Sequence, residues 1–278
     1  MAAEGTLIRK GGARVEEILE GGWQTRVRRI GDRVHRSSSP WSPAVISLLR
    51  HLAEAGFEAS PRPIGSGFDD EGDEVLAFVP GESPQPHPWS DEAAGRIGAL
   101  LRELHRAAAS FEPPTDPRWK IWYGRSLGEG PDVVGHGDLG PWNIMASDGL
   151  PVGFIDWDYA GPINRVSELA QVAWLNAQLH DDDVAERVGL SDAVGRAKQV
   201  GLIVDGYGLG RADRVGFVDR MVEHAVHSAR DEAAQNGVTP DTTSALGAGG
   251  FPVLWSITWR TRSASWMLRN RRTLEAAL

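Results

Sequence analysis

Hydrophobic and polar positions near the N-terminus form short runs separated by turn residues. The runs cover residues 14–19, 24–30 and 33–36, and Gly21-Gly22 and Gly31-Asp32 lie between them. Short runs linked by glycine-containing turns are typical of β-hairpins. The pattern therefore predicts three strands of a small antiparallel sheet at the start of the chain.

The pattern then changes to a helical period. Apolar residues recur at helical spacing from Pro43 to Ala55, and Gly56 ends the stripe, which predicts a helix that begins at a proline. Residues 60–72 are rich in Pro, Gly and Asp and predict a loop. The apolar residues 74–79 follow as a further strand.

Helical stripes dominate the rest of the chain. Ser90 precedes a strong helix signal that continues to His105, and its Ser-Asp-Glu start is typical of a capped helix. Further stripes, separated by short loops, follow after Asn164 at residues 169–179, 193–207, 214–234 and 253–268. Together with the strands, they predict an α+β fold in which a small antiparallel sheet precedes a larger, mostly helical part.

Composition and charge narrow the class of protein. The 278 residues are enough for two parts with a core each, and the absence of cysteine excludes disulfides and thiolate zinc sites. A net charge of -9 argues against nonspecific nucleic-acid binding, because Lys and Arg must neutralise the phosphates. Residues 1–12 lack the features of a signal peptide, and no run approaches the roughly 20 apolar residues that span a bilayer. We therefore expect a cytoplasmic protein without a membrane or nucleic-acid partner.

Two polar motifs carry the candidate chemistry. The run from His136 to Asn143 places Asp138 and Asn143 five positions apart, and Asp156 ends the apolar run 151–155. Phosphoryl transfer from a metal-bound nucleotide needs a carboxylate that accepts or orients the proton of the attacking hydroxyl, and further oxygen ligands for Mg²⁺. Asp138 fits the first role, and Asn143 with Asp156 fits the second. Such residues are also common in turns, but their spacing and order match the catalytic loop and the metal-binding strand end of kinases.

These motifs resemble those of the aminoglycoside phosphotransferase family. The resemblance implies a two-lobed, protein-kinase-like fold, with a nucleotide-binding lobe at 1–81 and a catalytic and substrate-binding lobe at 82–278. It also implies that Mg-ATP or Mg-GTP binds between the lobes and passes its γ-phosphoryl group to a small-molecule hydroxyl. The sequence motifs Asp-Leu-x-Pro-x-Asn and Ile-Asp-Trp-Asp-Tyr-Ala-Gly-Pro are similar to those of a bacterial branch of trifolitoxin-immunity-like phosphotransferases.

Residues of the first lobe are candidates for nucleotide binding. In the resembled fold, Gly21 and Gly22 would form the loop over the phosphates, where absent side chains let backbone amides approach. An ordinary hairpin turn explains them equally well. The hinge backbone of Phe78, Val79 and Gly81 would hydrogen-bond the base, although this segment can also be a plain strand end.

The familiar kinase pair of a strand lysine and a helix glutamate is missing. The only lysines are Lys10, Lys120 and Lys198, and none falls on the third strand. Arg36 ends that strand and is the nearest replacement as a phosphate contact, although a guanidinium differs in geometry from an ammonium. The helix after Pro43 offers only Glu54, near its end, as a partner.

Several residues near the motifs have expected supporting roles. His136 and His105 are expected to pack and to hydrogen-bond rather than to catalyse. Glu168 is expected to brace the catalytic loop through backbone amides, where the resembled family carries Asp. Trp142 and Trp157 are expected to face the cleft, because they adjoin catalytic positions in the sequence.

Three functions fit the sequence. A phosphotransferase acting on a small metabolite or natural product is supported by the complete set of Asp138, Asn143 and Asp156. A kinase of peptide Ser or Thr side chains shares the chemistry, and a long open cleft rather than a closed pocket would favour it. A noncatalytic nucleotide- or ligand-binding immunity or regulatory protein is favoured by the missing lysine and glutamate, and opposed by the intact metal ligands. The sequence leaves open the acceptor, the choice between ATP and GTP, and the oligomeric state.

Overall fold

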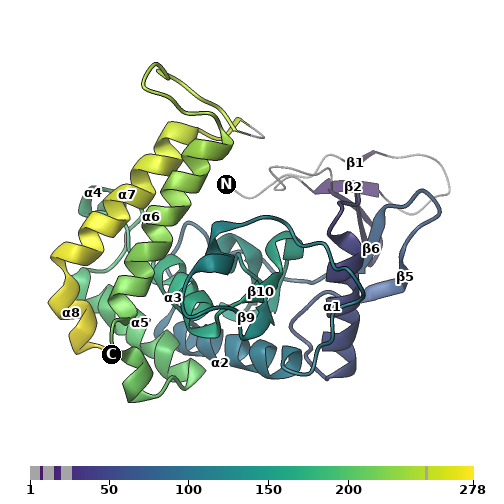
Figure 1. The fold of residues 1–278 in the computed structure, drawn as a ribbon, viewed down its shortest axis with the longest axis horizontal. Helices are drawn as coiled ribbons and strands as arrows, with labels where there is room; N and C mark the ends of the chain where they lie inside the picture. The colour runs from purple at the N-terminus through teal and green to yellow at the C-terminus, as the bar shows by residue number, and fades with distance from the viewer. Residues whose placement is uncertain (1–6, 9–15, 20–26, 248–249) are drawn as a thin grey trace.

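The computed structural model describes residues 7–8, 16–19, 27–247 and 250–278. A small part with an antiparallel sheet and a larger, mostly helical part lie at opposite ends of the molecule (Figure 1). The α+β architecture expected from the sequence is confirmed. Within the described residues, no helix is long and apolar enough to cross a membrane.

The smaller part is built on a six-stranded antiparallel sheet. Its strand order is β1-β2-β3-β4-β6-β5. The strands are β1 (Leu7–Ile8), β2 (Glu16–Leu19), β3 (Val27–Ile30), β4 (Arg33–Arg36), β5 (Pro63–Phe68) and β6 (Glu74–Ala77). The three expected hairpin strands correspond to β2, β3 and β4, while Gly21 and Gly22 lie outside the described residues.

One helix accompanies this sheet. Helix α1 (Ser42–Glu54) has Pro43 in its first turn, as expected, and it buries its apolar stripe completely. Proline is tolerated there because the first amides of a helix have no intrahelical acceptor. The stripe packs into the hydrophobic core that continues into the larger part, so α1 helps to hold the two parts together.

The prediction of a loop at residues 60–72 is wrong, because β5 lies within it. β5 is an edge strand of the sheet, and its pairing with β6 is irregular between Pro63 and Phe68. Edge strands tolerate proline and glycine, and here Gly65 and Gly67 have positive φ angles. The residues that indicated a loop are therefore those of a bulged edge strand.

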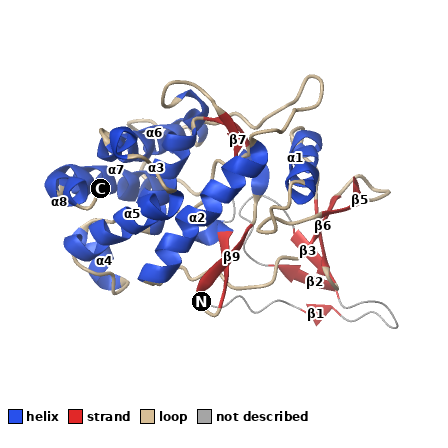
Figure 2. Ribbon diagram, turned by 90° about the horizontal axis from the view of Figure 1, so that it is seen from below, coloured by secondary structure: helices blue, strands red, loops and turns tan. Residues whose placement is uncertain are grey.

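The larger part is a helical assembly with two small two-stranded sheets. The helices are α2 (Asp91–Ala108), α3 (Arg165–Asn176), α4 (Asp182–Arg187), α5 (Ala193–Tyr207), α6 (Phe217–Gln235), α7 (Val253–Arg269) and α8 (Arg271–Ala276). The strands are β7 (Val133–Gly135), β8 (Ile144–Ser147), β9 (Leu150–Phe154) and β10 (Gly161–Ile163). β7 pairs with β10, and β8 pairs with β9. Helix α2 lies between the helical assembly and the sheet, as Figures 1 and 2 show from two directions.

Capping residues explain where α2 and α3 begin. Ser90 accepts a hydrogen bond from the amide of Ala93 at the start of α2, as its sequence predicts. The stripe expected at 169–179 begins earlier, because Asn164 caps α3 and starts that helix at Arg165. This earlier start places Glu168 in the first turn of α3, next to the loop that follows β7.

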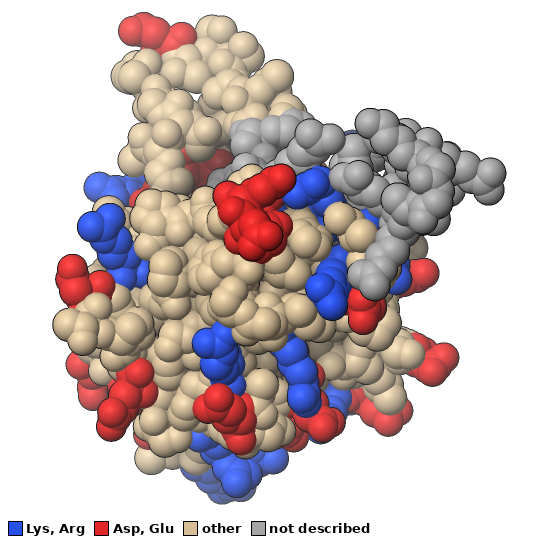
Figure 3. All heavy atoms as spheres, turned by 90° about the vertical axis from the view of Figure 1, so that its right-hand side faces the viewer, with Lys and Arg blue, Asp and Glu red and all other residues tan. Residues whose placement is uncertain are grey.

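Charged side chains are mixed on the surface at the small end. On the face in Figure 3, the described lysine and arginine side chains are interspersed with acidic ones rather than gathered in one patch.

Candidate functional site

The loop after β7 carries Asp138 and requires glycine at position 137. Gly137 has a φ angle of 84°, and a Cβ added there would lie 2.5 Å from the carbonyl oxygen of Tyr159. Only glycine adopts such a conformation without a side-chain cost and allows this close approach. The His-Gly-Asp sequence therefore holds the loop tightly against the segment that follows Asp156.

His136 connects the two motifs. Its Nδ1 accepts a hydrogen bond from the Asp138 amide at 3.3 Å, and its Nε2 donates to the carbonyl of Ile155 at 2.9 Å. One accepting and one donating nitrogen is the pattern of a neutral imidazole, and burial lowers the pKa of His136 in agreement. The ring also packs on Trp157, with 4.5 Å between the centroids. His136 is thus structural, as expected.

Asn143 lies beside Asp138, at the end of a short helix (Pro141–Asn143) that directly precedes β8. Its Nδ2 donates to the backbone carbonyl of Asp138 at 2.7 Å and to the Asp138 carboxylate at 3.1 Å. Its own backbone carbonyl accepts from the amide of Ile155 at 2.9 Å. Because the amide nitrogen is engaged with Asp138, the side-chain oxygen of Asn143 is the atom available to a metal ion.

Asp156 follows β9 in a left-handed backbone conformation, with φ 59° and ψ 71°. This conformation is uncommon for residues other than glycine, although Asp adopts it more readily than most, and such residues cluster at functional sites. About half of the Asp156 side chain is exposed. The carboxylate is therefore accessible, next to the residue that bonds both Asn143 and His136.

The donor atoms at this point fit magnesium. A carboxylate and an amide oxygen are hard ligands, and Mg²⁺ commonly takes one or two of them while water and substrate phosphates complete its shell. Within the described ranges, no group of three or more Asp, Glu or His side chains is arranged to hold a metal by itself. Asn143 and Asp156 thus suit an ion that arrives with a nucleotide.

Asp138 has the electrostatics of a base that works near neutral pH. Burial, together with the negative charge of Asp156, raises the pKa of Asp138 to about 6. A hydrogen bond from Trp142 and the charges of Arg260 and Lys120 oppose this rise. A carboxylate in this range accepts a proton better than an ordinary surface Asp, while it is still ionised at pH 7.

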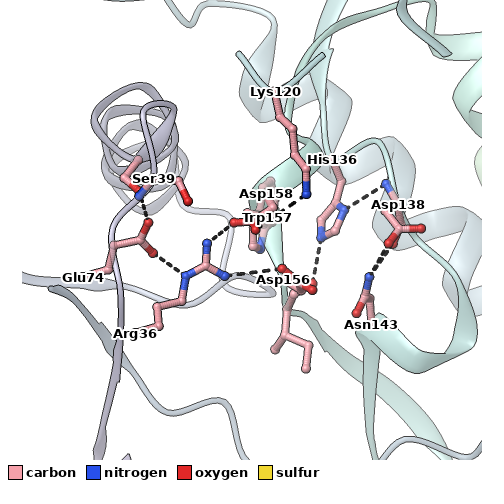
Figure 4. Close-up of polar contacts among 12 residues, drawn as sticks. Arg36, Ser39, Glu74, Lys120, His136, Asp138, Asn143, Asp156, Trp157 and Asp158 are labelled. Atoms are coloured by element: carbon pink, nitrogen blue, oxygen red, sulfur yellow. Dashed lines mark hydrogen bonds and ion pairs between the residues drawn. The ribbon is translucent and has the colours of Figure 1, made fainter. Parts of the chain in front are cut away.

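Arg36 joins the sheet to the segment that carries Asp156 and Asp158. Its Nε donates to Glu74 at 2.6 Å and its Nη1 to Asp156 at 3.3 Å, and its Nη2 donates to Asp158 (Figure 4). Burial disfavours the Arg36 charge, but the carboxylates of Glu74, Asp158 and Asp156 together raise its pKa. Asp158 is buried and takes part in this ion pair.

Glu74 supplies the partner that was sought on the helix. It is the register partner of Arg36 on the neighbouring strand β6, is 1% exposed, and also accepts a hydrogen bond from Ser42 of α1. The missing lysine–glutamate pair is thus replaced by a cross-strand pair of Arg36 and Glu74. The signal in the sequence for this pair is a glutamate at the start of an otherwise apolar strand.

The hinge segment lies against the β8–β9 hairpin. Gly81 has a φ angle of 133°, and a Cβ there would lie 2.6 Å from the carbonyl oxygen of Ala146. Glu82 exchanges two backbone hydrogen bonds of 2.9 Å with Ala146, and the Val79 side chain packs on Gly153. The ring of Phe78 is covered by the Arg29 guanidinium, 3.7 Å from its centroid. The candidate base-binding segment therefore contacts the hairpin that links Asn143 to Asp156.

The two tryptophans beside the motifs differ. Trp142 lies next to Asp138, where its indole N–H favours the ionised carboxyl and so opposes the rise of the Asp138 pKa. The expectation that Trp157 faces the cleft is wrong, because its side chain is 2% exposed and its indole N–H donates to the carbonyl of Phe154. It belongs to the core beneath His136.

Glu168 braces the loop that carries Asp138, as expected. One carboxylate oxygen accepts from the amide of Gly137 at 2.6 Å, and the other accepts from Nε2 of His105 at 2.7 Å. Nδ1 of His105 in turn contacts the Tyr207 hydroxyl at 2.8 Å. Burial opposes ionisation of Glu168, but the His105 hydrogen bond and charge outweigh it and lower the pKa.

Replacing Glu168 by Ala should destabilise the protein by roughly 3–5 kcal/mol, because it leaves buried groups without their partner. Denaturant unfolding measures this effect. Glu103→Ala, on the exposed side of α2, is the control and should change the free energy of unfolding by about 0.5 kcal/mol or less. Because the Glu168 pKa lies below its ordinary value of 4.5, its stabilisation is present above pH 4.5 and is lost as the pH falls below it. Equal effects of the two variants would contradict the bracing role.

A protein-family model and a curated relative both match this chain. A model of the phosphotransferase enzyme family matches residues 16–128 and 117–199. The trifolitoxin immunity protein of Rhizobium leguminosarum bv. trifolii is 54% identical over 263 residues, which cover 95% of this chain and 98% of the relative.

Solved structures share the fold. An amicoumacin kinase in complex with AMP-PNP, Ca²⁺ and Ami has a TM-score of 0.61 at 12% identity, over 99% of this chain and 89% of that chain. A spectinomycin phosphotransferase in complex with ADP and spectinomycin has a TM-score of 0.54 at 11% identity, over 96% of this chain and 93% of that chain. The expected protein-kinase-like fold is confirmed.

Proposed function

Because the chain belongs to the phosphotransferase enzyme family, we propose that it moves the γ-phosphoryl group of Mg-ATP or Mg-GTP to a hydroxyl group of a small molecule or natural product. The observation that carries this proposal is the joining of Asp138, Asn143 and Asp156 into one site through His136 and the backbone of Ile155.

Each site residue has a proposed role. Asp138 accepts the proton of the attacking hydroxyl, and Asn143 and Asp156 hold Mg²⁺ through oxygen atoms. When bound, the metal neutralises charge on the phosphates. Arg36 is the proposed phosphate contact, because its guanidinium lies beside Asp156 and presents several donors.

The lobes and the base-binding segment follow from the same proposal. A boundary between residues 81 and 82 places the sheet and α1 in the nucleotide-binding lobe. The backbone of Phe78, Val79 and Gly81 would then contact the base at this boundary. Gly21 and Gly22 remain proposed phosphate-loop residues.

The relative's name points to an acceptor class. A 54% identical protein is called a trifolitoxin immunity protein, so a toxin-type natural product is the first acceptor to test. Chemical modification of such a compound would make immunity an enzymatic property.

A noncatalytic immunity protein is the second candidate. It is favoured by Arg36, which pairs with both Asp156 and Asp158 and thereby neutralises carboxylates next to the proposed metal site. In that case the chain would bind its ligand without transferring phosphate.

Transfer of labelled phosphate separates the two candidates. ATP and GTP labelled at the γ-phosphorus are incubated with Mg²⁺, the protein and a panel of hydroxylated natural products that includes trifolitoxin. We expect label to appear on an acceptor with an equal amount of nucleoside diphosphate, and to be absent with Asp138→Asn. An acceptor that binds to the nucleotide-loaded protein but stays unlabelled would favour the noncatalytic candidate.

A further inference from the structure

Lys120 enters the site from the larger part of the molecule. It lies between α2 and the short helix η1 (Tyr123–Ser126), and its Nζ is 4.0 Å from a carboxylate oxygen of Asp158. The side chain is only 15% exposed. Figure 4 shows its ammonium group pointing toward Asp158.

Aromatic rings from both parts flank this ammonium. Nζ lies 3.9 Å from the ring centroid of Tyr159, which follows Asp158, and 5.3 Å from that of Trp41, which precedes α1. Both distances are within the range of cation–π attraction. The rings therefore hold a charged group at the junction of the two parts.

The backbone of Lys120 is fixed as well. Arg125 donates to the Lys120 carbonyl from Nε at 3.1 Å and from Nη2 at 2.9 Å. The same Nη2 donates to the carbonyls of Tyr159 and Ala160, both at 3.0 Å. One guanidinium thus ties Lys120 to the segment just after Asp158. The next side chain, Ile121, is 91% exposed, whereas that of Lys120 points inward.

Two cations approach the carboxylates from opposite sides. Arg36 reaches Asp158 from the sheet, and Lys120 reaches it from the larger part (Figure 4). Burial lowers the pKa of Lys120, while the charges of Asp158, Asp156 and Asp138 act in the opposite direction. Lys120 thus lies within electrostatic reach of both the proposed metal ligand and the proposed base.

The position of the Lys120 ammonium corresponds to that expected for the transferred γ-phosphoryl group. In an in-line transfer, the γ-phosphoryl lies between the metal-bound phosphates and the attacking oxygen, which here means between Asp156 and Asp138. An ammonium is a compact charge with three donors, well suited to phosphate oxygens. We propose that Lys120 contacts the γ-phosphate of the bound nucleotide, in addition to the phosphate contact proposed for Arg36. This inference rests on the proposed function.

Paired dissociation constants test the contact without an acceptor. Calorimetric titration gives the dissociation constants of Mg-ATP and Mg-ADP, and of Mg-GTP and Mg-GDP, for the wild type, Lys120→Met and Lys120→Arg. We expect Lys120→Met to weaken triphosphate binding roughly 10- to 100-fold, with diphosphate binding unchanged and Lys120→Arg in between. Lys198→Met is the control, because Lys198 is an exposed lysine paired with Asp91, and it should bind both forms normally.

The outcomes separate this inference from the function beneath it. Equal weakening of triphosphate and diphosphate binding, or no weakening of either, would overturn the γ-phosphate contact while the nucleotide site stands. A folded wild type that binds no nucleotide would instead overturn the proposed function, and the inference with it. Melting curves test whether each variant is folded. If Lys120→Met does not fold, Lys120→Gln provides the same comparison.

Discussion

Replacing Asp138 by Asn should lower the turnover number by roughly 100- to 10,000-fold, the usual contribution of a positioned general base. Asn has the same shape and can still accept the hydrogen bond from Asn143, so the loop should keep its structure. It cannot take the proton of the acceptor hydroxyl. Because Asp138 is not a proposed metal ligand, calorimetry should give a Mg-nucleotide affinity close to that of the wild type. Unchanged turnover would exclude Asp138 as the base.

The same substitution should stabilise the ligand-free protein. The pKa of Asp138 is raised from 3.8 to about 6, so the folded state binds a proton more tightly than the unfolded state. Its contribution to stability is therefore full below pH 3.8 and falls as the pH rises to about 6. An asparagine does not titrate, so it loses no stability over this pH range. The melting temperature of Asp138→Asn minus that of the wild type should therefore increase between pH 4 and pH 7. A lower relative melting temperature at pH 7 would contradict the raised pKa.

The pH dependence of catalysis follows from the same group. The value of kcat/KM should rise with pH through about 6 and level off above it, since the base must be ionised in the free enzyme. A profile without this acidic limb would indicate a different base.

Replacing Asp156 by Asn should weaken Mg-dependent nucleotide binding by at least 10- to 100-fold. Mutating a residue that only supports a metal ligand already lowers metal affinity by roughly this factor, and Asp156 is proposed to be a ligand itself. Asn tolerates the left-handed conformation of this position, so the change removes mainly charge. Titration with ATP and GTP, with and without Mg²⁺, measures the effect. Binding without Mg²⁺ should change far less.

Asp148→Asn is the matched control for this variant. Asp148 lies in the turn between β8 and β9, is exposed, and also has a positive φ angle, 51°. The control therefore repeats the residue types and the backbone conformation away from the site, and it should leave binding unchanged. Equal Mg-nucleotide affinity in Asp156→Asn and Asp148→Asn would show that Asp156 is not a metal ligand.

The sequence was informative where the site is local in the chain. Asp138 and Asn143 belong to one loop and a short helix, so their spacing already determines that they lie together. Asp156 could be placed because it ends an apolar strand. The bracing role of Glu168 could be inferred only from the family resemblance, since the family carries Asp at this place, and the hydrogen bond to His105 could not be inferred.

Features that depend on distant pairing were missed. Glu74 meets Arg36 only through the register of β4 and β6, 38 positions apart in the chain. β5 carries turn-like residues because it is an edge strand. Lys120 lies in a stretch without regular periodicity, and its direction is set by Arg125 and by aromatic rings from both parts. Trp157 was misplaced because adjacency in sequence does not decide which face of a short helix is buried.

Calorimetric titration of the wild type with ATP and GTP, each with and without Mg²⁺, tests the central claim that this is a working nucleotide-dependent phosphotransferase site. We predict saturable binding of at least one nucleotide that requires Mg²⁺, in spite of the absent strand lysine. Folded protein that binds neither nucleotide in the presence of Mg²⁺ would contradict it.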